Sequence, residues 1–310
     1  MRVLVTGGTG YLGGAIVRAV ERHGHTPLVF ARRATTAVAA GTPVAGDIRD
    51  RTAVFDAVRK ADAVCHSAAL VSVWSRRLQD FDEVNVGGLQ NVLDAAQAGG
   101  VAKVVYTSSF LAMPPADQPA VLAGNDYQRT KAAARRVARA AAQRGLPIVT
   151  MVPGVVYGPG ASTEGNLVGK MVRDHLAGRL PGVLGGDRIW SFAWIDDVAD
   201  AHVMALERAP AGSEYQVGGE NVPQVRLFEI VRELTGRPLP RRIPFLVANA
   251  LALVDATRAR IFGASPQLTP GTVEILRHDW PLDSTRSIDE LGYRITPLAD
   301  GVRTLLTSIT

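Results

Sequence analysis

Short apolar runs alternate with longer mixed stretches along the first half of the chain. The runs cover residues 3–6, 27–31, 44–45, 63–66, 104–108 and 147–152. Runs of this length, bounded by turn residues, are typical of strands buried on both faces, and the stretches between them have helical composition. The alternation predicts an α/β fold built on a doubly wound parallel sheet with right-handed crossovers.

The pattern becomes irregular after about residue 158. Proline and glycine interrupt residues 178–186, and several shorter helical stretches follow. The most apolar of these, residues 243–254, is too short to span a bilayer and contains Asn249. We therefore expect this stretch to form a helix that packs in the core or lines a pocket.

Composition narrows the class of protein. The 310 residues are enough for one large α/β domain with a smaller lobe, and 47% hydrophobic with 20% charged residues is typical of a folded globular chain. Cys65 is the single cysteine, so no disulfide can form within the chain, which favours a reducing compartment. No signal peptide is visible before the first predicted strand. We expect a cytoplasmic protein.

The basic balance says little about partners. The net charge is +5, but the arginines are scattered and no stripe of basic and aromatic residues is present. A solvated arginine surface that also favours an anionic cofactor explains this charge better than nucleic-acid binding does. We expect no nucleic-acid partner and no membrane partner.

Glycines follow the first predicted strand at once. They give both Gly8-x-Gly10-x-x-Gly13 and the narrower Gly7-x-x-Gly10-x-x-Gly13, and residues 15–22 then read as a helix. A pyrophosphate needs a tight turn, close backbone approach and the free N–H groups of a helix N-terminus. Strand, glycine turn and helix in this order therefore predict a dinucleotide site.

Tyr127 and Lys131 form the second chemical signal. They lie four residues apart at the start of a stretch rich in alanine and arginine, so they share one face of a predicted helix. A fixed ammonium stabilises a phenolate and lowers the pKa of the phenol from about 10 toward neutrality. Tyr127 is therefore a candidate proton donor or acceptor.

With these motifs in this order, the chain resembles the extended short-chain dehydrogenase/reductase family, the NAD-dependent epimerase/dehydratase superfamily, over nearly its whole length. Further short motifs carry the resemblance: Gly46-Asp47-Ile48-Arg49-Asp50, His66-Ser67-Ala68-Ala69, Asn85-Val86-Gly87-Gly88, Tyr106-Thr107-Ser108-Ser109, 153–160 and 194–199.

The resemblance implies a Rossmann-type domain with a smaller C-terminal substrate-binding lobe. The dinucleotide-binding domain would cover 1–157 with a return segment at about 189–204, and the lobe would cover 158–188 and 205–310. A homodimer that acts on a small-molecule substrate is the family expectation. The residues that the resemblance places on the cofactor are Thr6, Gly7, Thr9, Gly10, Tyr11, Leu12, Gly13, Arg32, Asp47, Ile48, Ala68, Ala69, Tyr127, Lys131, Pro153, Gly154, Val155 and Val156.

The end of the second strand bears on which dinucleotide binds. An NAD site usually has an acidic residue there, but no Asp or Glu occurs between Glu21 and Asp47, and Arg32 and Arg33 occupy the position. Because a guanidinium matches a 2′-phosphate, we expect NADP(H), with NAD(H) as the alternative.

The resemblance also implies a catalytic trio of Ser109, Tyr127 and Lys131. Ser109 would polarise a substrate carbonyl, although Ser108 stays open as the hydroxyl, because strand alternation would put Thr107 and Ser109 on one face and Ser108 on the other. Asn85 would support the site through water or simply cap a helix.

Other polar groups are expected to be structural. His66 is expected to pack or hydrogen-bond, and Asp196 with Asp197 is expected at a helix start. No metal site is expected, because the six histidines form no tight cluster.

Two enzyme branches share the fold and the trio. One reduces ketones or oxidises alcohols on apolar, ring-bearing substrates, as dihydroflavonol reductases do, and the other epimerises or dehydrates sugar nucleotides with tightly bound NAD. Many of the latter carry an Arg-Asp pair where this chain has Trp190 and Ser191. The sequence therefore favours an NADPH-dependent reductase similar to dihydroflavonol 4-reductase. The epimerase stays the first alternative and a non-catalytic NADP(H) sensor the second.

Overall fold

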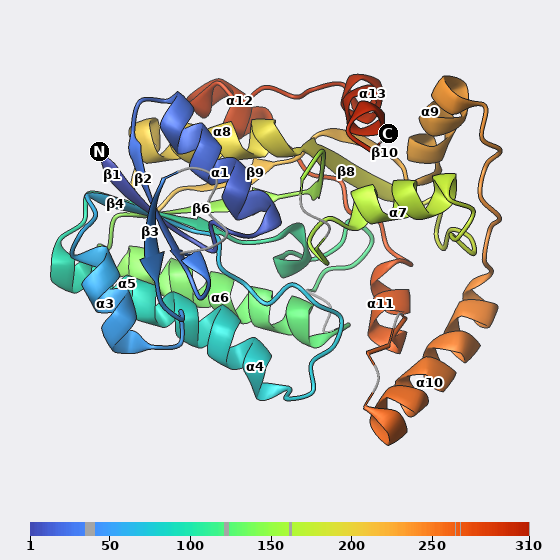
Figure 1. Ribbon diagram of the computed structural model, residues 1–310, viewed down its shortest axis with the longest axis horizontal. Coiled ribbons are helices and arrows are strands. Elements are labelled where there is room, and N and C mark those ends of the chain that lie inside the picture. Colours follow the sequence, from blue (N-terminus) through green and yellow to red (C-terminus); the bar gives the residue numbers. More distant parts are fainter. Residues whose placement is uncertain (35–40, 121–123, 161–162, 264, 267, 310) are drawn as a thin grey trace.

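A seven-stranded parallel sheet forms the centre of the computed structural model (Figure 1), with strand order β3-β2-β1-β4-β5-β6-β9. The structure describes residues 1–34, 41–120, 124–160, 163–263, 265–266 and 268–309, with the Arg260 side chain left aside. The strands are β1 (Arg2–Thr6), β2 (Thr26–Ala31), β3 (Thr42–Ala45), β4 (Ala63–His66), β5 (Val104–Thr107), β6 (Ile148–Pro153) and β9 (Glu214–Val217). The predicted Rossmann-type α/β fold is confirmed.

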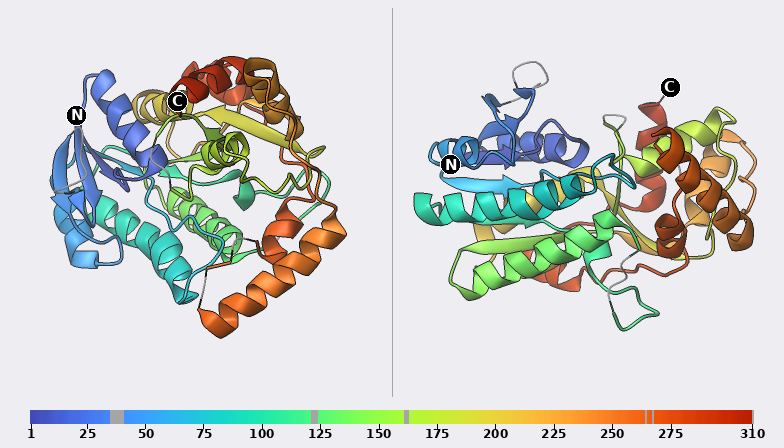
Figure 2. Two further views of the ribbon diagram at one scale, coloured as in Figure 1. Left: turned by 45° about the vertical axis from the view of Figure 1, so that its right-hand side comes forward. Right: turned by 90° about the horizontal axis from the view of Figure 1, so that it is seen from below.

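Helices cover both faces of this sheet, as the views in Figures 1 and 2 show. On one face lie α1 (Tyr11–Arg22), α8 (Ile195–Arg208) and α12 (Thr285–Leu291), and on the other lie α3 (Arg51–Val58), α5 (Gly88–Gly99) and α6 (Asp126–Gln143). Each face encloses its own apolar core, because the strands alternate their side chains between the two sides.

A second, three-stranded sheet has the order β10-β8-β7. Its strands are β7 (Val155–Tyr157), β8 (Ile189–Trp194) and β10 (Glu220–Pro223). The chain passes from the large sheet to the small one at Gly154, where a Cβ would lie 2.4 Å from the Ser191 carbonyl oxygen. Glycine is therefore required where the two sheets meet.

The short helix α4 (Gln79–Asp82) packs beside α6. The remaining helices surround the small sheet and extend beyond it. They are α7 (Leu167–Leu176), α9 (Val225–Thr235), α10 (Phe245–Phe262), α11 (Pro270–Ile275) and α13 (Leu298–Thr307). The alternating aromatics Trp190, Phe192 and Trp194 of β8 are all buried in this third core. These three aromatics therefore serve core packing.

The domain division stays a prediction. Strand β9 lies within the range assigned to the C-terminal lobe, yet it pairs in parallel with β6 in the large sheet. Strand β8 lies in the expected return segment but belongs to the small sheet, whereas the following α8 packs against α1. The chain thus returns to the large domain through α8 and β9.

Of the two roles expected for residues 243–254, core packing is wrong for the outer side of the helix, whereas Leu253 and Val254 do line a surface pocket. Only the alanine side of α10 is covered: Ala248 and Ala252 are 1% and 0% exposed, whereas Leu246 is 82% exposed and Val254 67%. Apolar composition was taken as a sign of burial, but α10 extends along the outside of the molecule and contacts it mainly through α11 (Figure 1).

Candidate active site

The glycine loop joins β1 to α1 at the carboxyl edge of the large sheet. Gly7 has a positive φ of 72°, and its carbonyl oxygen accepts from the Gly10 N–H at 2.8 Å. A Cβ on Gly13 would lie 2.1 Å from that same oxygen, so the loop closes only with glycine there. Helix α1 begins at Tyr11 and has no side-chain cap at Gly10. The loop provides the close backbone approach and the free N–H groups of a helix N-terminus that a pyrophosphate requires. These residues therefore fit a dinucleotide.

The neighbouring strand ends bring basic and acidic groups together. Exposed Arg32 follows β2, and Asp47 follows β3. The Asp47 carboxylate accepts from Arg49 Nη2 at 2.7 Å, and this hydrogen bond, helped by the charge of Arg32, lowers its pKa. Arg32 therefore lies near Asp47 at the edge where the adenosine end of a dinucleotide would bind.

Hydrogen bonds join the ends of β1 and β4. Thr6 Oγ1 lies 2.7 Å from His66 Nδ1 and accepts from the Ala68 N–H at 3.3 Å. His66 is buried, and burial lowers its pKa to about 3, so it stays neutral and serves as the hydrogen-bonding residue expected. A Cβ on Gly7 would lie 2.8 Å from Ala68 Cα. Strand β4 and the glycine loop are therefore held in direct contact.

The other residues expected on the cofactor also lie at strand ends. Thr9 is exposed, Leu12, Ala69 and Val156 are partly buried, and Ile48 is 7% exposed against Gly88. Tyr11 donates its hydroxyl to the Gly158 carbonyl at 2.9 Å and so ties α1 to the chain beyond β7. Pro153, Gly154 and Val155 pass from β6 to β7. The structure thus collects these residues along one edge.

Tyr127, Ser109 and Lys131 meet at the ends of β5 and α6. Tyr127 is the second residue of α6 and Lys131 lies one turn later, as predicted. Lys131 is 4% exposed, and its Nζ donates to the Thr107 carbonyl at 2.8 Å. Ser109 begins the short 3₁₀ helix Phe110–Ala112, and its Oγ accepts from the Leu111 N–H at 3.2 Å.

Burial opposes the acidity that was predicted for Tyr127. It raises the pKa of the phenol to about 12, and the Ser109 hydroxyl, within hydrogen-bonding reach, works against this rise. Burial also lowers the pKa of Lys131 to about 7. The expectation of a lowered phenol pKa is wrong, because burial raises the pKa of the phenol and the Ser109 hydroxyl offsets only part of this rise.

The position of Ser109 distinguishes it from the two hydroxyls before it. Strand β5 ends at Thr107, so the alternation on which their expected faces depended does not continue. The Thr107 hydroxyl lies 2.9 Å from His202 Nε2 on the α8 side of the sheet, and Ser108 Oγ is buried beside Tyr106. Ser109 is therefore the hydroxyl of the three that is near Tyr127.

Two amides that fix this geometry lie outside the expected catalytic trio. Asn85, in the π-helical turn Glu83–Gly87, accepts from the Leu70 N–H at 2.7 Å and donates to Thr130 Oγ1 at 3.0 Å. It braces α6 directly and is not a helix cap. Asn125 caps α6 by accepting from the Gln128 N–H at 2.8 Å, and the Gln128 side chain accepts from the Gly124 N–H at 3.0 Å, one residue before the cap. The spacing Asn-x-x-Gln could have revealed this helix start.

The C-terminal lobe closes the site beside the short loop that precedes α6. The Gly124 backbone contacts Gly271 at the start of α11 so closely that a Cβ on either would clash with the other's carbonyl. Asp117 lies 2.9 Å from His278 Nδ1. Gly271 and His278 therefore cover this side of the site.

Asp196 and Asp197 were expected at a helix start, with a structural role. The Asp197 carboxylate accepts from the Thr296 N–H and hydroxyl at 2.7 and 3.0 Å, which confirms its structural role.

Among the described residues, no three His, Cys, Asp or Glu side chains gather closely enough to hold a metal ion. Within that same part of the chain, no helix has both the length and the apolar character needed to cross a membrane.

Comparisons with known proteins agree with this geometry. The chain is 32% identical over 308 residues to sterol demethylase protein B of Methylococcus capsulatus, covering 94% of this chain and 93% of the relative. It is 31% identical to 2-alkyl-3-oxoalkanoate reductase of Stenotrophomonas maltophilia, covering 82% of each. It also resembles the structure of Thermus thermophilus UDP-glucose 4-epimerase in complex with NAD, with a TM-score of 0.74, 25% identity and coverage of 100% and 99%.

The family assignment follows from the extent of one match. The sequence model of the NAD dependent epimerase/dehydratase family matches residues 3–218, well over half of the chain. This range contains the glycine loop, Ser109, Tyr127 and Lys131. The protein therefore belongs to the NAD-dependent epimerase/dehydratase family of extended short-chain dehydrogenases/reductases.

Proposed function

We propose that the protein is an NADP(H)-dependent oxidoreductase that reduces a ketone, or oxidises the matching secondary alcohol, on a small apolar or ring-bearing substrate. The observation that carries the proposal is the meeting of Ser109, Tyr127 and Lys131 at one strand end, beside a glycine loop that fits a dinucleotide. These are the groups that carbonyl reduction needs: a proton donor, a hydrogen bond to the oxygen and a cation.

Each residue has a definite task in this mechanism. The bound dinucleotide would supply the hydride. The Tyr127 hydroxyl donates its proton to the substrate oxygen as charge develops there, and the Ser109 hydroxyl donates a second hydrogen bond to that oxygen. Lys131, held by the Thr107 carbonyl, would bind the ribose hydroxyls of the dinucleotide and, in its protonated form, would stabilise the phenolate left on Tyr127. Protonation from solvent restores the phenol.

The choice of NADP(H) rests on the strand end after β2. Arg32 is exposed there, and its charge acts on Asp47 at the neighbouring strand end. Residues 22–46 contain no carboxylate for a ribose 2′-hydroxyl. A guanidinium in this place supports recognition of a 2′-phosphate.

The substrate class rests on the small sheet and on the relatives. Trp190 is buried in the third core and Ser191 Oγ accepts from the Gly219 N–H at 3.1 Å, so neither is available for a diphosphate. Arg179, which could otherwise bind a phosphate, forms an ion pair with Asp174. The printed names of the two relatives above, a sterol demethylase component and a 2-alkyl-3-oxoalkanoate reductase, both suggest a largely apolar substrate.

Cofactor binding followed by turnover tests the proposal. Binding of NADPH and of NADH would be measured by calorimetry, and NADPH oxidation would then be followed at the nicotinamide absorbance with a panel of alicyclic and aromatic ketones. Preferred NADPH binding with net oxidation supports the reductase. Tightly held NAD with interconversion of UDP-sugars and no ketone turnover would establish the epimerase, and binding without turnover on either panel would favour the sensor.

A further inference from the structure

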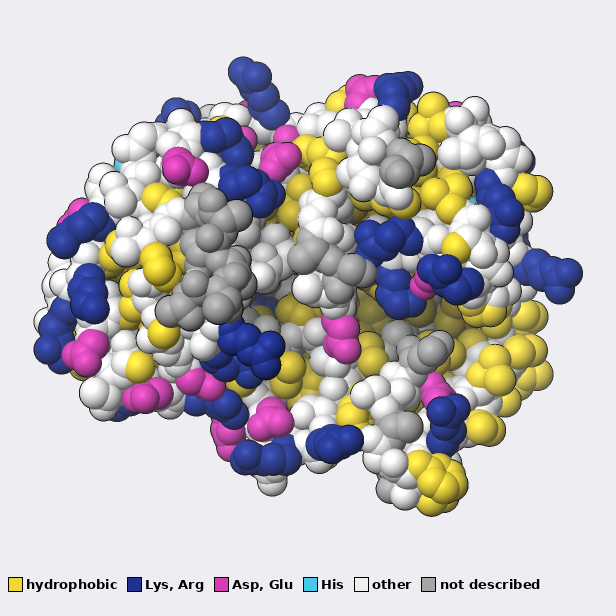
Figure 3. Space-filling view, in the orientation of Figure 1, with side chains coloured by type: hydrophobic (Ala, Val, Ile, Leu, Met, Phe, Trp, Pro, Cys, Tyr) yellow, Lys and Arg dark blue, Asp and Glu magenta, His cyan; other side chains and the backbone are white. Residues whose placement is uncertain are grey.

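Helix α10 carries the largest concentration of exposed apolar side chains on the described surface. Seven of its 18 residues are large hydrophobic side chains at least 48% exposed. They are Leu246, Val247, Leu251, Leu253, Val254, Ile261 and Phe262. In Figure 3 hydrophobic side chains gather at the lower right, where Figure 1 places α10. Such patches usually mark a binding surface.

The two sides of α10 reverse the usual order of a surface helix. Three of its alanines are buried against the protein: Ala259 is 4% exposed, and Ala248 and Ala252 pack with Leu184 and Val273 of the neighbouring segments. Its leucines, valines, isoleucine and C-terminal phenylalanine face outward. Since helices normally bury their larger apolar residues, this arrangement indicates that the outward face is covered by something else.

The charge around this face is positive. Residues 236–263 contain five arginines and one acidic residue, Asp255. The Asp255 carboxylate is engaged by the Leu268 N–H at 3.1 Å, on the side of the helix that faces the molecule. Arg241, Arg242 and Arg258 are exposed. Five arginines and one aspartate give these 28 residues a net charge of +4, close to the +5 of the whole chain, so α10 and the segment before it are cationic.

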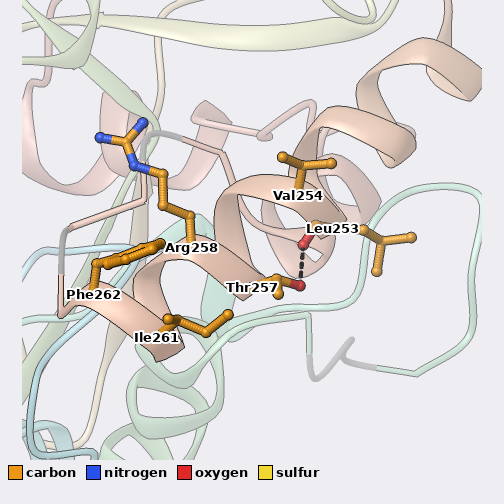
Figure 4. A pocket seen from close by; sticks show the side chains of 6 residues that line it. All are labelled: Leu253, Val254, Thr257, Arg258, Ile261 and Phe262. Carbon is orange, nitrogen blue, oxygen red and sulfur yellow. Dashed lines mark hydrogen bonds between the residues drawn. The ribbon is translucent and has the colours of Figure 1, made fainter.

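The size and shape of the face favour a bilayer over a second protein. An 18-residue helix is about 27 Å long and 10 Å wide, which gives a footprint of roughly 300 Å². A stable protein interface needs about 800 Å² from each partner. Figure 4 shows that the pocket at the end of the helix, between Leu253 and Phe262, is lined by α10 alone, so it encloses no small ligand.

We infer that the outward face of α10 binds the surface of a lipid bilayer containing anionic headgroups. The helix lies in the plane of the interface, with its apolar side chains among the upper acyl chains and its arginines at the phosphates. Arg258, between the apolar residues, extends its guanidinium back to the headgroups. No membrane partner was expected because residues 243–254 are too short to span a bilayer, but a helix that lies in the interface does not need to span it.

Vesicle co-sedimentation tests the inference. The full chain is mixed with vesicles of phosphatidylcholine alone or with added phosphatidylserine. We expect pelleting with the anionic vesicles that falls as salt rises, and an affinity at least about ten-fold weaker for Leu253→Ser combined with Ile261→Ser. Ile288→Ser, which removes an exposed apolar side chain from α12, is the matched control and is expected to pellet like the parent.

Four results would overturn the inference. The first is a parent chain that stays in the supernatant with both vesicles, and the second is a double variant that pellets as strongly as the parent. The third is a dimer, seen by light scattering, that the double variant splits, which would make a second copy the occupant. A variant that gains a signal on binding gives a further test, because it does not rely on a loss of binding. The tryptophan fluorescence of Leu253→Trp should shift to shorter wavelength on anionic vesicles, and the absence of a shift is the fourth result that contradicts the inference.

Discussion

At the scale of single residues, the site depends on a balance between burial and charge. The phenol of Tyr127 is partly buried, and this raises its pKa to about 12, whereas burial lowers the pKa of Lys131 to about 7. Both shifts favour the neutral forms. A neutral phenol is the form that can donate a proton to a substrate oxygen, so the raised pKa suits reduction, in which Tyr127 acts as an acid.

The first prediction concerns that proton. Tyr127→Phe removes the hydroxyl but keeps the ring, so NADPH affinity should change little while turnover falls by about 10²-fold or more. Single-turnover kinetics and NADPH titration would measure the two effects. Tyr157→Phe is the matched control, because its buried hydroxyl lies in the third core and has no hydrogen-bond partner. Turnover equal to the parent in Tyr127→Phe would contradict the assigned role.

The second prediction concerns Arg32. Loss of a charge-assisted hydrogen bond to a 2′-phosphate costs about 1.5–3 kcal/mol, so Arg32→Ala should reduce the preference for NADPH over NADH by at least about ten-fold. Titration of both cofactors measures the ratio. Arg303→Ala removes an exposed arginine from α13, far along the chain, and should leave the ratio unchanged. An unaltered preference in Arg32→Ala would remove the basis for its role.

At the scale of elements, the sequence predicts features that depend on a few consecutive residues. It does not predict features that depend on which segments pack beside an element. The buried strands, the glycine loop and the helix carrying Tyr127 and Lys131 each have a pattern contained in a few consecutive residues. The exposure of α10 and the pairing of β9 with β6 depend on which segments arrive beside them. An apolar helix has the same sequence pattern whether it packs in the core of its own chain or against another surface. The sequence therefore could not distinguish a buried helix from an exposed one.

The third prediction concerns the start of α6. The Asn125 side chain caps this helix at the turn that contains Tyr127. Asn125→Ala should lower the free energy of unfolding by about 1 kcal/mol, and it should also lower turnover, because the frayed turn no longer holds the Tyr127 hydroxyl beside Ser109. Asp50→Ala removes the corresponding cap of α3. Urea denaturation should show similar losses for both variants, with turnover at saturating cofactor reduced only in Asn125→Ala.

At the scale of the whole molecule, two buried histidines link neighbouring elements at the same edge of the large sheet. His66 contacts Thr6 between β4 and β1, and His202 of α8 contacts Thr107 at the end of β5. The Val198 carbonyl lies 2.7 Å from His202 Nδ1, so that nitrogen donates and Nε2 accepts from the Thr107 hydroxyl. The same strand end supplies the carbonyl that holds Lys131. The core and the site therefore share a hydrogen-bond network that requires a neutral imidazole.

The pH dependence of stability follows from this requirement. Burial lowers the pKa of His202 to about 4, whereas an imidazole in the unfolded chain titrates near 6.5. Between these values the unfolded state binds more protons, so the free energy of unfolding falls as the pH drops from 6.5 toward 4. His202→Gln lacks the titrating group and should lose about 2 kcal/mol less than the parent between pH 6.5 and 4.5. Urea denaturation at both pH values measures the difference. Equal losses in the two proteins would mean that the imidazole is protonated within the fold, which the bonds to Val198 and Thr107 do not allow together.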